Sequence, residues 1–305
     1  MTFETRRLVR REYQLYLFVI PALIVVFLFN YLPLFSNVIA FMDYDFAAGW
    51  MGLESEWVGF MWFAQILSDP LFWQLLLRTL FYSVVIIIVG FPAPIILALL
   101  LNEVRIQAFK RVVQSITYVP RFVSWVVIAS LAYLFLSTDA TGIYNNILEL
   151  FGLPRRTVMG DASNFWIVLG VTHVYKSAGW GSIIYLAAIS ALDPQLYEAA
   201  EIDGAGRWKQ FLHVTFPGIL PTTMILLVLT IGGLFSTSFD QVLNLQNPII
   251  RADTNTINVY TFYAGVRGGQ YSVATAVGLF QGAINAVALV TANILGKKLT
   301  SYGLY

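Results

Sequence analysis

Long apolar runs separated by short charged segments are the main pattern of this 305-residue sequence. Residues 13–42 contain no Asp, Glu, Lys, Arg or His, and a helix needs about 20 apolar residues to cross a membrane. The run is too long for a signal peptide and has no clear cleavage site, so we expect a retained first helix. Further spans are expected at about 71–101, 112–136, 164–192, 219–244 and 271–295.

The predicted fold is therefore all-α, with six transmembrane helices in one polytopic domain over residues 13–295. A basic segment, 1–12, precedes this domain and a tail, 296–305, follows it. The composition agrees with a membrane protein, because 58% of the residues are hydrophobic and 11% are charged, with a mean hydropathy of +0.72. Soluble domains carry about 25% charged residues.

The composition also excludes several kinds of chemistry. Without cysteine there is no thiol catalysis and no thiolate metal site. The two histidines, His173 and His213, are far apart in sequence, and we expect no metal site. No G-x-x-x-x-G-K-[ST] motif occurs, so any ATP that drives this protein must be bound by another subunit.

One charged segment, residues 193–217, lies between the fourth and fifth apolar runs and cannot lie in hydrocarbon. Asp193 can cap a helix that starts at Pro194, and Gly204 allows a sharp turn before a second short helix. Pro217 and Pro221 are expected to mark the start of the next span. Two short helices in water, with small alanines between them, predict a docking surface.

Orientation follows from the placement of Lys and Arg. With the N-terminus inside, 11 of the 18 basic residues fall in cytoplasmic segments, including Arg6, Arg7, Arg10 and Arg11. The positive-inside rule therefore puts the charged segment and both termini in the cytoplasm.

The pattern Glu198-Ala-Ala, followed by Asp203-Gly-Ala, Phe211, Pro217 and Pro221, resembles the cytoplasmic coupling loop of ABC importer permeases. The similarity extends over nearly the whole chain, to the polysaccharide-type permeases that import oligosaccharides such as those from pectin or alginate. The stretches that carry it are Phe91–Glu103, Tyr118–Val127, Gly179–Ala188, Leu192–Ala200, Gly269–Phe280 and Lys297-Lys298-Leu299.

This resemblance implies a type I importer permease (MetI-like) fold in a bacterial inner membrane and a subunit that is not itself an enzyme. The implied partners are a second homologous permease, two ATPase subunits and an extracytoplasmic solute-binding protein. ATP and Mg would be bound by the ATPases, and the chain would need no cofactor of its own.

For the coupling loop (residues 193–217), the resemblance implies that the helix carrying Glu198, Ala199 and Ala200 seats in a groove of the ATPase. Asp203, Gly204 and Ala205 would form the turn that fixes the second helix. Arg207 and Lys209 are expected to pair with acids across that interface.

Charges inside spans are costly and usually face a cavity or a partner. Arg121 and Lys176 are therefore candidates for the substrate path, although Arg121 could instead reach the inner interface. Asp240 could pair with a cation or lie at the outer interface. Aromatic rings and amides that bind sugars, or that simply pack, are supplied by Trp125, Tyr175, Trp180, Gln241, Asn244, Gln281 and Asn285.

The two cations favour an acidic, uronate-like oligosaccharide such as one from alginate. A neutral oligosaccharide or another sugar is the alternative. A self-sufficient secondary transporter is a further alternative, but it would have no use for a coupling loop. No cluster of catalytic residues is evident inside the spans.

Overall fold

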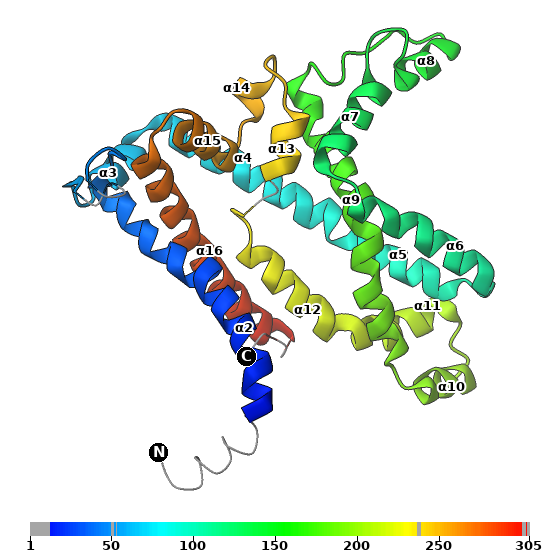
Figure 1. Cartoon of the computed structure of the whole chain (residues 1–305). Helices are drawn as coiled ribbons and strands as arrows, with labels where there is room; N and C mark the ends of the chain where they lie inside the picture. The colour runs from blue at the N-terminus through cyan, green and yellow to red at the C-terminus, as the bar shows by residue number, and fades with distance from the viewer. Residues whose placement is uncertain (1–12, 50–51, 53, 237–238, 301–302, 304–305) are drawn as a thin grey trace, which may run out of the picture. The chain divides into compact units, whose positions relative to one another are not determined.

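The computed structural model describes residues 13–49, 52, 54–236, 239–300 and 303, which are mostly helical (Figure 1). The basic segment 1–12 of the sequence analysis lies outside the described residues. The chain divides into two compact units, Met1–Ser68 with Tyr263–Phe280 and Asp69–Phe262 with Gln281–Tyr305.

The first unit begins with α2 (Tyr13–Val26), which continues through a π turn and a 3-10 segment to Phe41, as the first apolar run predicts. A short hairpin follows, in which β1 (Met42–Asp43) pairs antiparallel with β2 (Glu56–Trp57). Ser272 fixes this hairpin to the start of the last helix, because its hydroxyl donates to Met42 O at 2.7 Å and accepts from Tyr44 N at 3.0 Å. The unit also contains α3 (Met61–Ser68) and η7 (Tyr263–Arg267).

The second predicted span is one helical stretch in the other unit. It starts at Asp69, whose carboxylate accepts from Leu71 N at 2.8 Å, and Pro70 occupies the first turn. Its parts are α4 (Pro70–Val85), η4 (Ile86–Gly90) and α5 (Pro92–Glu103). Pro92 thus begins α5 within a continuing helix.

The predicted third span is broken near Pro120 and Arg121. A helix formed by α6 (Gln107–Tyr118) and η5 (Val119–Phe122) meets α7 (Trp125–Leu136) at an angle of 106°. Ser124 caps α7 by accepting from Val127 N at 3.4 Å. We call this bend, residues 119–125, the elbow.

The predicted fourth span is α9 (Ala162–Ser190), which follows the capping residue Asp161. A short helix that the sequence analysis did not predict, α8 (Ile143–Leu150), precedes it. After α9 come α10 (Pro194–Ile202), α11 (Arg207–Gln210), η6 (Phe211–Thr215) and α12 (Phe216–Gly232).

Two predicted boundaries of the fifth span are wrong. The second helix of the coupling loop is not separate, because α11, η6 and α12 form one helix from Arg207 to Gly232 that contains both prolines. A π turn at Phe211–Thr215 and the first-turn position of Pro217 in α12 let this helix continue. The span also ends at Gly232 rather than at 244.

The remaining elements of this unit are α13 (Phe239–Leu245), α14 (Arg251–Thr254) and α15 (Ile257–Phe262). The last helix is α16 (Tyr271–Thr300). Its residues up to Phe280 belong to the first unit, and those from Gln281 belong to the second. The helix extends past 295, the predicted end of the sixth span, and Lys297 and Lys298 lie in its last turn, where cations are favourable.

Within the described residues, four helical stretches are long and apolar enough to cross a membrane, and the bent third span would make a fifth. They are Leu17–Phe41, Pro70–Glu103, Arg207–Gly232 and Tyr271–Lys298. The predicted fourth span, α9, has 29 residues but is not among them, because Thr172, His173 and Lys176 reduce its apolar character. The count of six spans therefore stays a prediction.

Candidate functional site

The coupling loop forms a helix and a turn directly after α9 (Figure 1). Asp193 starts α10 by accepting from Gln195 N at 2.9 Å, as predicted. No residue of α10 is buried, and its apolar Leu196 and Ile202 are 53% and 88% exposed. Glu198, Ala199 and the partly buried Ala200 lie on this helix, so α10 has the exposed surface of a docking element.

The turn after α10 requires glycine at one position. Gly204 has φ of +75°, a conformation that costs other residues energy. Its N–H donates to Glu201 O at 3.0 Å, and Ala205 N donates to Ala200 O at 2.8 Å. Asp203 is exposed beside them. These bonds fix the direction in which the following helix leaves the turn.

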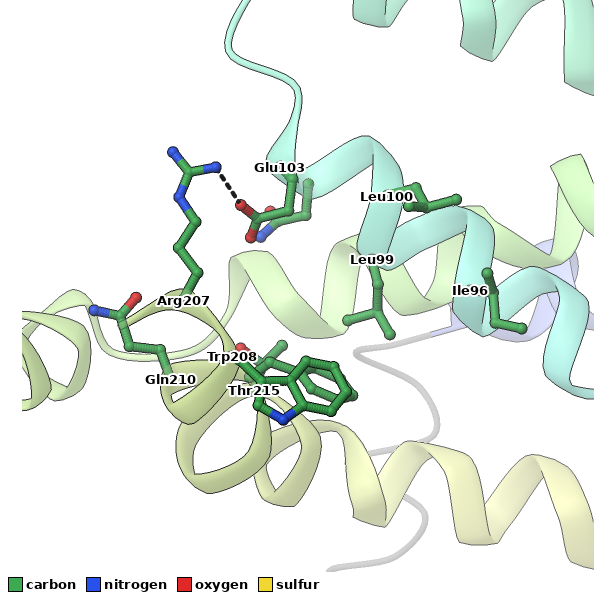
Figure 2. A pocket seen from close by; sticks show the side chains of 10 residues that line it. Ile96, Leu99, Leu100, Glu103, Arg207, Trp208, Gln210 and Thr215 are labelled. Carbon is green, nitrogen blue, oxygen red and sulfur yellow. Dashed lines mark hydrogen bonds and ion pairs between the residues drawn. The ribbon is translucent and has the colours of Figure 1, made fainter. Parts of the chain in front are cut away.

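Arg207 contacts the end of the second span. Its guanidinium lies 3.3 Å from the carboxylate of Glu103, and both side chains are more than half exposed (Figure 2). The two residues border a largely apolar cavity of about 470 Å³ between α5 and the helix that begins at Arg207, with the indole of Trp208 in its wall. We expected Arg207 to pair across a subunit interface, whereas within the chain it pairs with Glu103. Lys209 makes no ion pair within the described residues.

The elbow is held by α9. The ammonium of Lys176 donates to the carbonyl oxygens of Val123 and, at 3.3 Å, of Arg121. It also lies 5.2 Å from the centre of the Trp125 ring, within cation–π range. Near the elbow, α6 and α9 approach closely, because a Cβ on Gly179 would fall 1.9 Å from Thr117 O.

Arg121 differs from Lys176 in having no partner. Its side chain is exposed, and no hydrogen bond or ion pair joins its guanidinium to any described residue. It borders a cavity of about 420 Å³ together with Ser177 and Trp180 of α9. Trp180 packs edge-on against Phe122 of the elbow, with ring centres 5.8 Å apart.

The elbow thus brings together four predicted path residues, Arg121, Trp125, Lys176 and Trp180. Tyr175 does not join them, because it borders a separate cavity. Asp240 is exposed on α13 and makes no ion pair within the described part of the chain.

The predicted amide residues bind other groups of the protein itself. Asn244 donates to Asp240 O on its own helix at 2.7 Å. Gln281 is buried and donates to Asn258 at 2.8 Å, while Asn285 accepts from Phe235 N at 2.9 Å. Gln241 is fully buried and donates to Leu169 O at 2.7 Å. These four amides therefore have structural partners and do not gather at the elbow.

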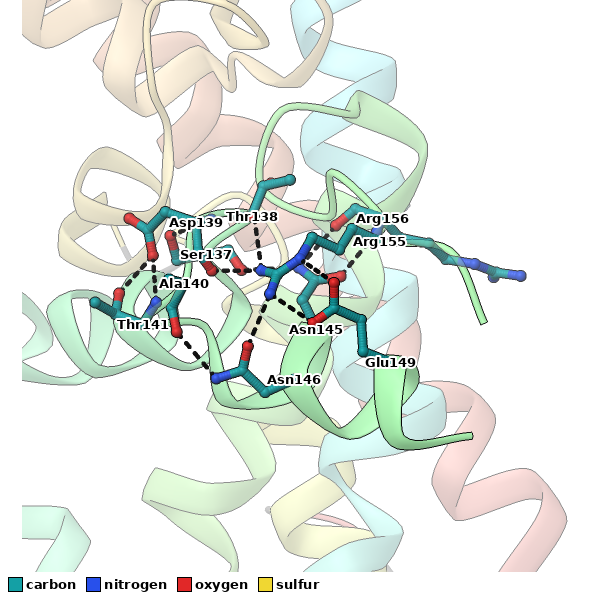
Figure 3. Close-up of polar contacts among 10 residues, drawn as sticks. All are labelled: Ser137, Thr138, Asp139, Ala140, Thr141, Asn145, Asn146, Glu149, Arg155 and Arg156. Carbon is teal, nitrogen blue, oxygen red and sulfur yellow. Dashed lines mark hydrogen bonds and ion pairs between the residues drawn. The ribbon is translucent and has the colours of Figure 1, made fainter. Parts of the chain in front are cut away.

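A polar network that the sequence analysis missed surrounds α8 (Figure 3). Arg155 forms an ion pair with Glu149 at 2.8 Å and donates to Asp139 O at 2.6 Å. The hydrogen bond from Arg155 lowers the pKa of Glu149, and hydrogen bonds from Thr141 lower the pKa of Asp139.

Comparison with known proteins gives one consistent result. Residues 75–301 match the family described as the binding-protein-dependent transport system inner membrane component. A polygalacturonan/rhamnogalacturonan transport system permease protein, YteP of Bacillus subtilis (strain 168), is 41% identical over 98% of this chain and 92% of its own length. Protein LplB of the same organism is 38% identical over 97% of this chain and 92% of its own length.

Among solved structures, a chain of a bacterial alginate ABC transporter, in complex with an alginate pentasaccharide-bound periplasmic protein, has a TM-score of 0.88. It is 33% identical, and the match covers 98% of this chain and 99% of that one. A second structure of a bacterial ABC transporter, involved in the import of the acidic polysaccharide alginate, gives a TM-score of 0.86 at 32% identity over 97% of this chain and 99% of that one.

Proposed function

Because the chain belongs to the family of inner membrane components of binding-protein-dependent transport systems, and is thus a non-catalytic permease of an ABC importer, we propose that it imports an acidic oligosaccharide. YteP is named for polygalacturonan and rhamnogalacturonan, and the transporter of similar structure carries alginate. All three polymers contain uronic acids, which bear one carboxylate per residue. Acidic oligosaccharides are therefore the substrate class that these relatives support.

The observation that carries this proposal is the unpartnered guanidinium of Arg121. A cation at membrane depth usually finds a counter-charge, and Arg121 has none within the described residues. A guanidinium binds a carboxylate through two parallel hydrogen bonds. Trp180 borders the same cavity and offers a ring face for a sugar. We assign Arg121 to the carboxylate and Trp180 to the sugar ring.

Lys176 takes a different part in the same path. Its ammonium is bound to the carbonyls of the elbow, so it orients Arg121 rather than meeting the substrate. We therefore reassign it, from the direct contact expected from sequence, to a positioning residue.

The coupling loop is the element that would transmit the work of ATP hydrolysis. The exposed α10 would dock on an ATPase subunit that binds ATP and Mg, and a second homologous permease would complete the pathway. Closure of the two ATPases would then move the coupling loops and tilt the attached helices as rigid bodies. Since only residues 191–193 separate α9 from α10, and α11 is continuous with α12, such motion would reach α9 and α12 through short connections.

In this proposal the coupling loop and both termini are cytoplasmic, as the distribution of Lys and Arg indicates. A solute-binding protein would deliver the sugar from the opposite side.

Uptake in cells tests the assignment of Arg121. Cells expressing the complete transporter with Arg121→Gln should import a galacturonate or alginate oligosaccharide at least about tenfold more slowly, because a hydrogen-bonded charge pair contributes about 1.5–3 kcal/mol. Arg105→Gln, which removes an exposed cation from the segment between α5 and α6, is the matched control and should leave uptake unchanged. Equal uptake of acidic sugar by wild type and Arg121→Gln would refute the assignment.

A further inference from the structure

A long apolar cavity beside α9 has no part in the path proposed above. It encloses about 660 Å³ between α7, α8 and the first half of α9. Its walls are almost entirely aliphatic or aromatic, and its lining includes Leu131, Phe135, Ile167, Val171 and Tyr175. Its volume lies within the usual range for pockets that bind small molecules, about 300–1,000 Å³.

A polar cavity of about 480 Å³ adjoins it at the start of α9. The two cavities share Tyr144, Val158 and Asn164 in their walls, which places them side by side. The polar end adds the side chains of Arg156, Thr157 and Asp161, and the carboxylate of Asp161 already accepts from Ser163 N at the start of α9. We call the two cavities together the α7–α9 groove.

Arg156 provides an unpaired cation at this polar end. Its backbone is fixed from both sides by the buried Asn145, which accepts from Arg156 N at 2.7 Å and donates to Arg156 O at 3.1 Å. Its guanidinium makes no hydrogen bond or ion pair with a described residue, and Figure 3 shows the side chain extending away from the Arg155 network. The anchored backbone and the free head group are suited to an anionic ligand.

The dimensions of the groove match one leaflet of a bilayer. The residues of α9 that border it run from Asn164 to Tyr175, a rise of about 16 Å at 1.5 Å per residue. The hydrocarbon core of a bilayer is about 30 Å thick, so the apolar part is about half as long. Its polar end lies at the start of α9, and the coupling loop follows the other end of the same helix.

We propose that the α7–α9 groove binds a membrane phospholipid, with an acyl chain along α9 and its phosphate at Arg156. A phosphodiester supplies the acceptor oxygens that a guanidinium binds in pairs, while Thr157 and Tyr144 offer hydroxyl donors beside it. A helix of another protein could fill the apolar part, but Arg156 does not line that part and would still lack an anionic partner. The lipid would brace α7 against α9 on the side of α9 away from the coupling loop.

Photolabelling of the complete transporter tests this proposal. The transporter is placed in nanodiscs that contain phosphatidylglycerol with a diazirine on its acyl chain, and labelled peptides are mapped by mass spectrometry. Label is expected in residues 128–136 and 167–175. Ala132→Trp fills the groove and should remove this label, whereas Ser130→Trp, on the same helix outside the lining, should retain it.

The head group is tested separately. Arg156→Gln should lower labelling by about fivefold, since one cation near a charged lipid surface contributes about that much, and Arg105→Gln should not. A diacylglycerol with the same photoreactive chain but no phosphate should label the groove weakly in every variant. The midpoint of thermal unfolding confirms that each variant is folded.

Two results would overturn the proposal. One is equal labelling of Ala132→Trp and Ser130→Trp, which would mean that lipid does not enter the groove. The other is a photoreactive residue placed at Val171 that cross-links to the second permease and not to lipid, which would make the groove a subunit interface. Neither result bears on the uptake experiment with Arg121→Gln, so the two proposals fail independently.

Discussion

The ammonium of Lys176 donates to the carbonyl oxygen of Val123, one helix away, at the point where the third span bends by 106°. A sharp bend in a helix leaves carbonyl groups without their usual partners, and inside a membrane water is scarce. A cation on the neighbouring α9 supplies the missing donor. Lys176, a charged residue inside a predicted span, therefore stabilises the elbow.

Removing this donor should destabilise the elbow. Lys176→Met keeps the length and apolar stem of the side chain but leaves two carbonyls unpaired, so we expect a loss of about 1.5–3 kcal/mol in unfolding free energy. Lys176→Arg should restore much of it, because the cation can still reach the carbonyls. Thermal unfolding of the purified complex measures both. Wild-type stability in Lys176→Met, together with a lost preference for acidic sugar, would instead make Lys176 a substrate contact.

The turn at Gly204 should disfavour a β-branched side chain. Gly204→Val forces a β-branched residue to φ of +75°, which costs about 1–2 kcal/mol and redirects α11. We expect weaker association with the ATPase and lower transport-coupled ATP hydrolysis, with normal membrane insertion. Gly206→Ala is the matched control, because Gly206 has φ of −69° and open space at its Cβ position. Full activity of Gly204→Val would contradict the role given to this turn.

The pair of Glu103 and Arg207 should contribute little to stability. Both side chains are more than half exposed, and exposed pairs typically contribute about 0.2–1 kcal/mol. A double-mutant cycle with Glu103→Gln and Arg207→Gln, followed by thermal unfolding, should give a coupling energy in that range. A coupling well above it would show that the pair is shielded from water in the assembled transporter.

The network around α8 predicts a response to acid. The pKa values of Glu149 and Asp139 are lowered by hydrogen bonds, so their stabilisation is complete above the ordinary carboxylate pKa of about 4 and is lost as pH falls through the lowered values. Hydrogen-exchange protection factors of residues 137–156 should therefore fall as the pH drops below about 4.

Glu149→Gln should reduce protection of the same residues at pH 7 and weaken its dependence on pH. Glu201→Gln, an acid exposed on α10, is the control. Protection that stays constant down to about pH 3 in the wild type would contradict this account of the network.

Several features of the fold could be predicted because a local signal dictates each of them. The absence of charge over 13–42 predicts the first helix, and Asp193 with Pro194 predicts the start of α10. Gly204 predicts the turn that follows. Each depends on residues within a few positions of one another.

The features that were mispredicted have two different causes. Pro217 and Pro221 suggested a boundary, yet the helix continues through them after a π turn at Phe211–Thr215, which the prolines alone do not indicate. The span ends at Gly232 rather than at 244, and Asn285 of α16 accepts from Phe235 N just beyond that end. Nothing near Asn285 in the sequence indicates this partner, so its amide looked available for sugar.

In the candidate site, too, some features follow from local sequence signals and others from contacts between distant residues. Arg121 and Lys176 were singled out because a charge inside a span is unusual in any context. Which of them is free could not be predicted, since that depends on how α9 crosses the elbow. Gly179, whose missing side chain allows α9 to approach Thr117, was only one glycine among many in the sequence.

The central claim is that this permease passes acidic oligosaccharides, and one measurement tests it most directly. The chain is reconstituted with its partner permease and ATPase in proteoliposomes, and ATP hydrolysis is recorded with binding protein loaded with uronate or with neutral oligosaccharides. Stimulation by uronate-loaded binding protein in the wild type, and its loss in Arg121→Gln, is the predicted result. Equal stimulation by neutral and acidic sugars in both proteins would contradict the claim.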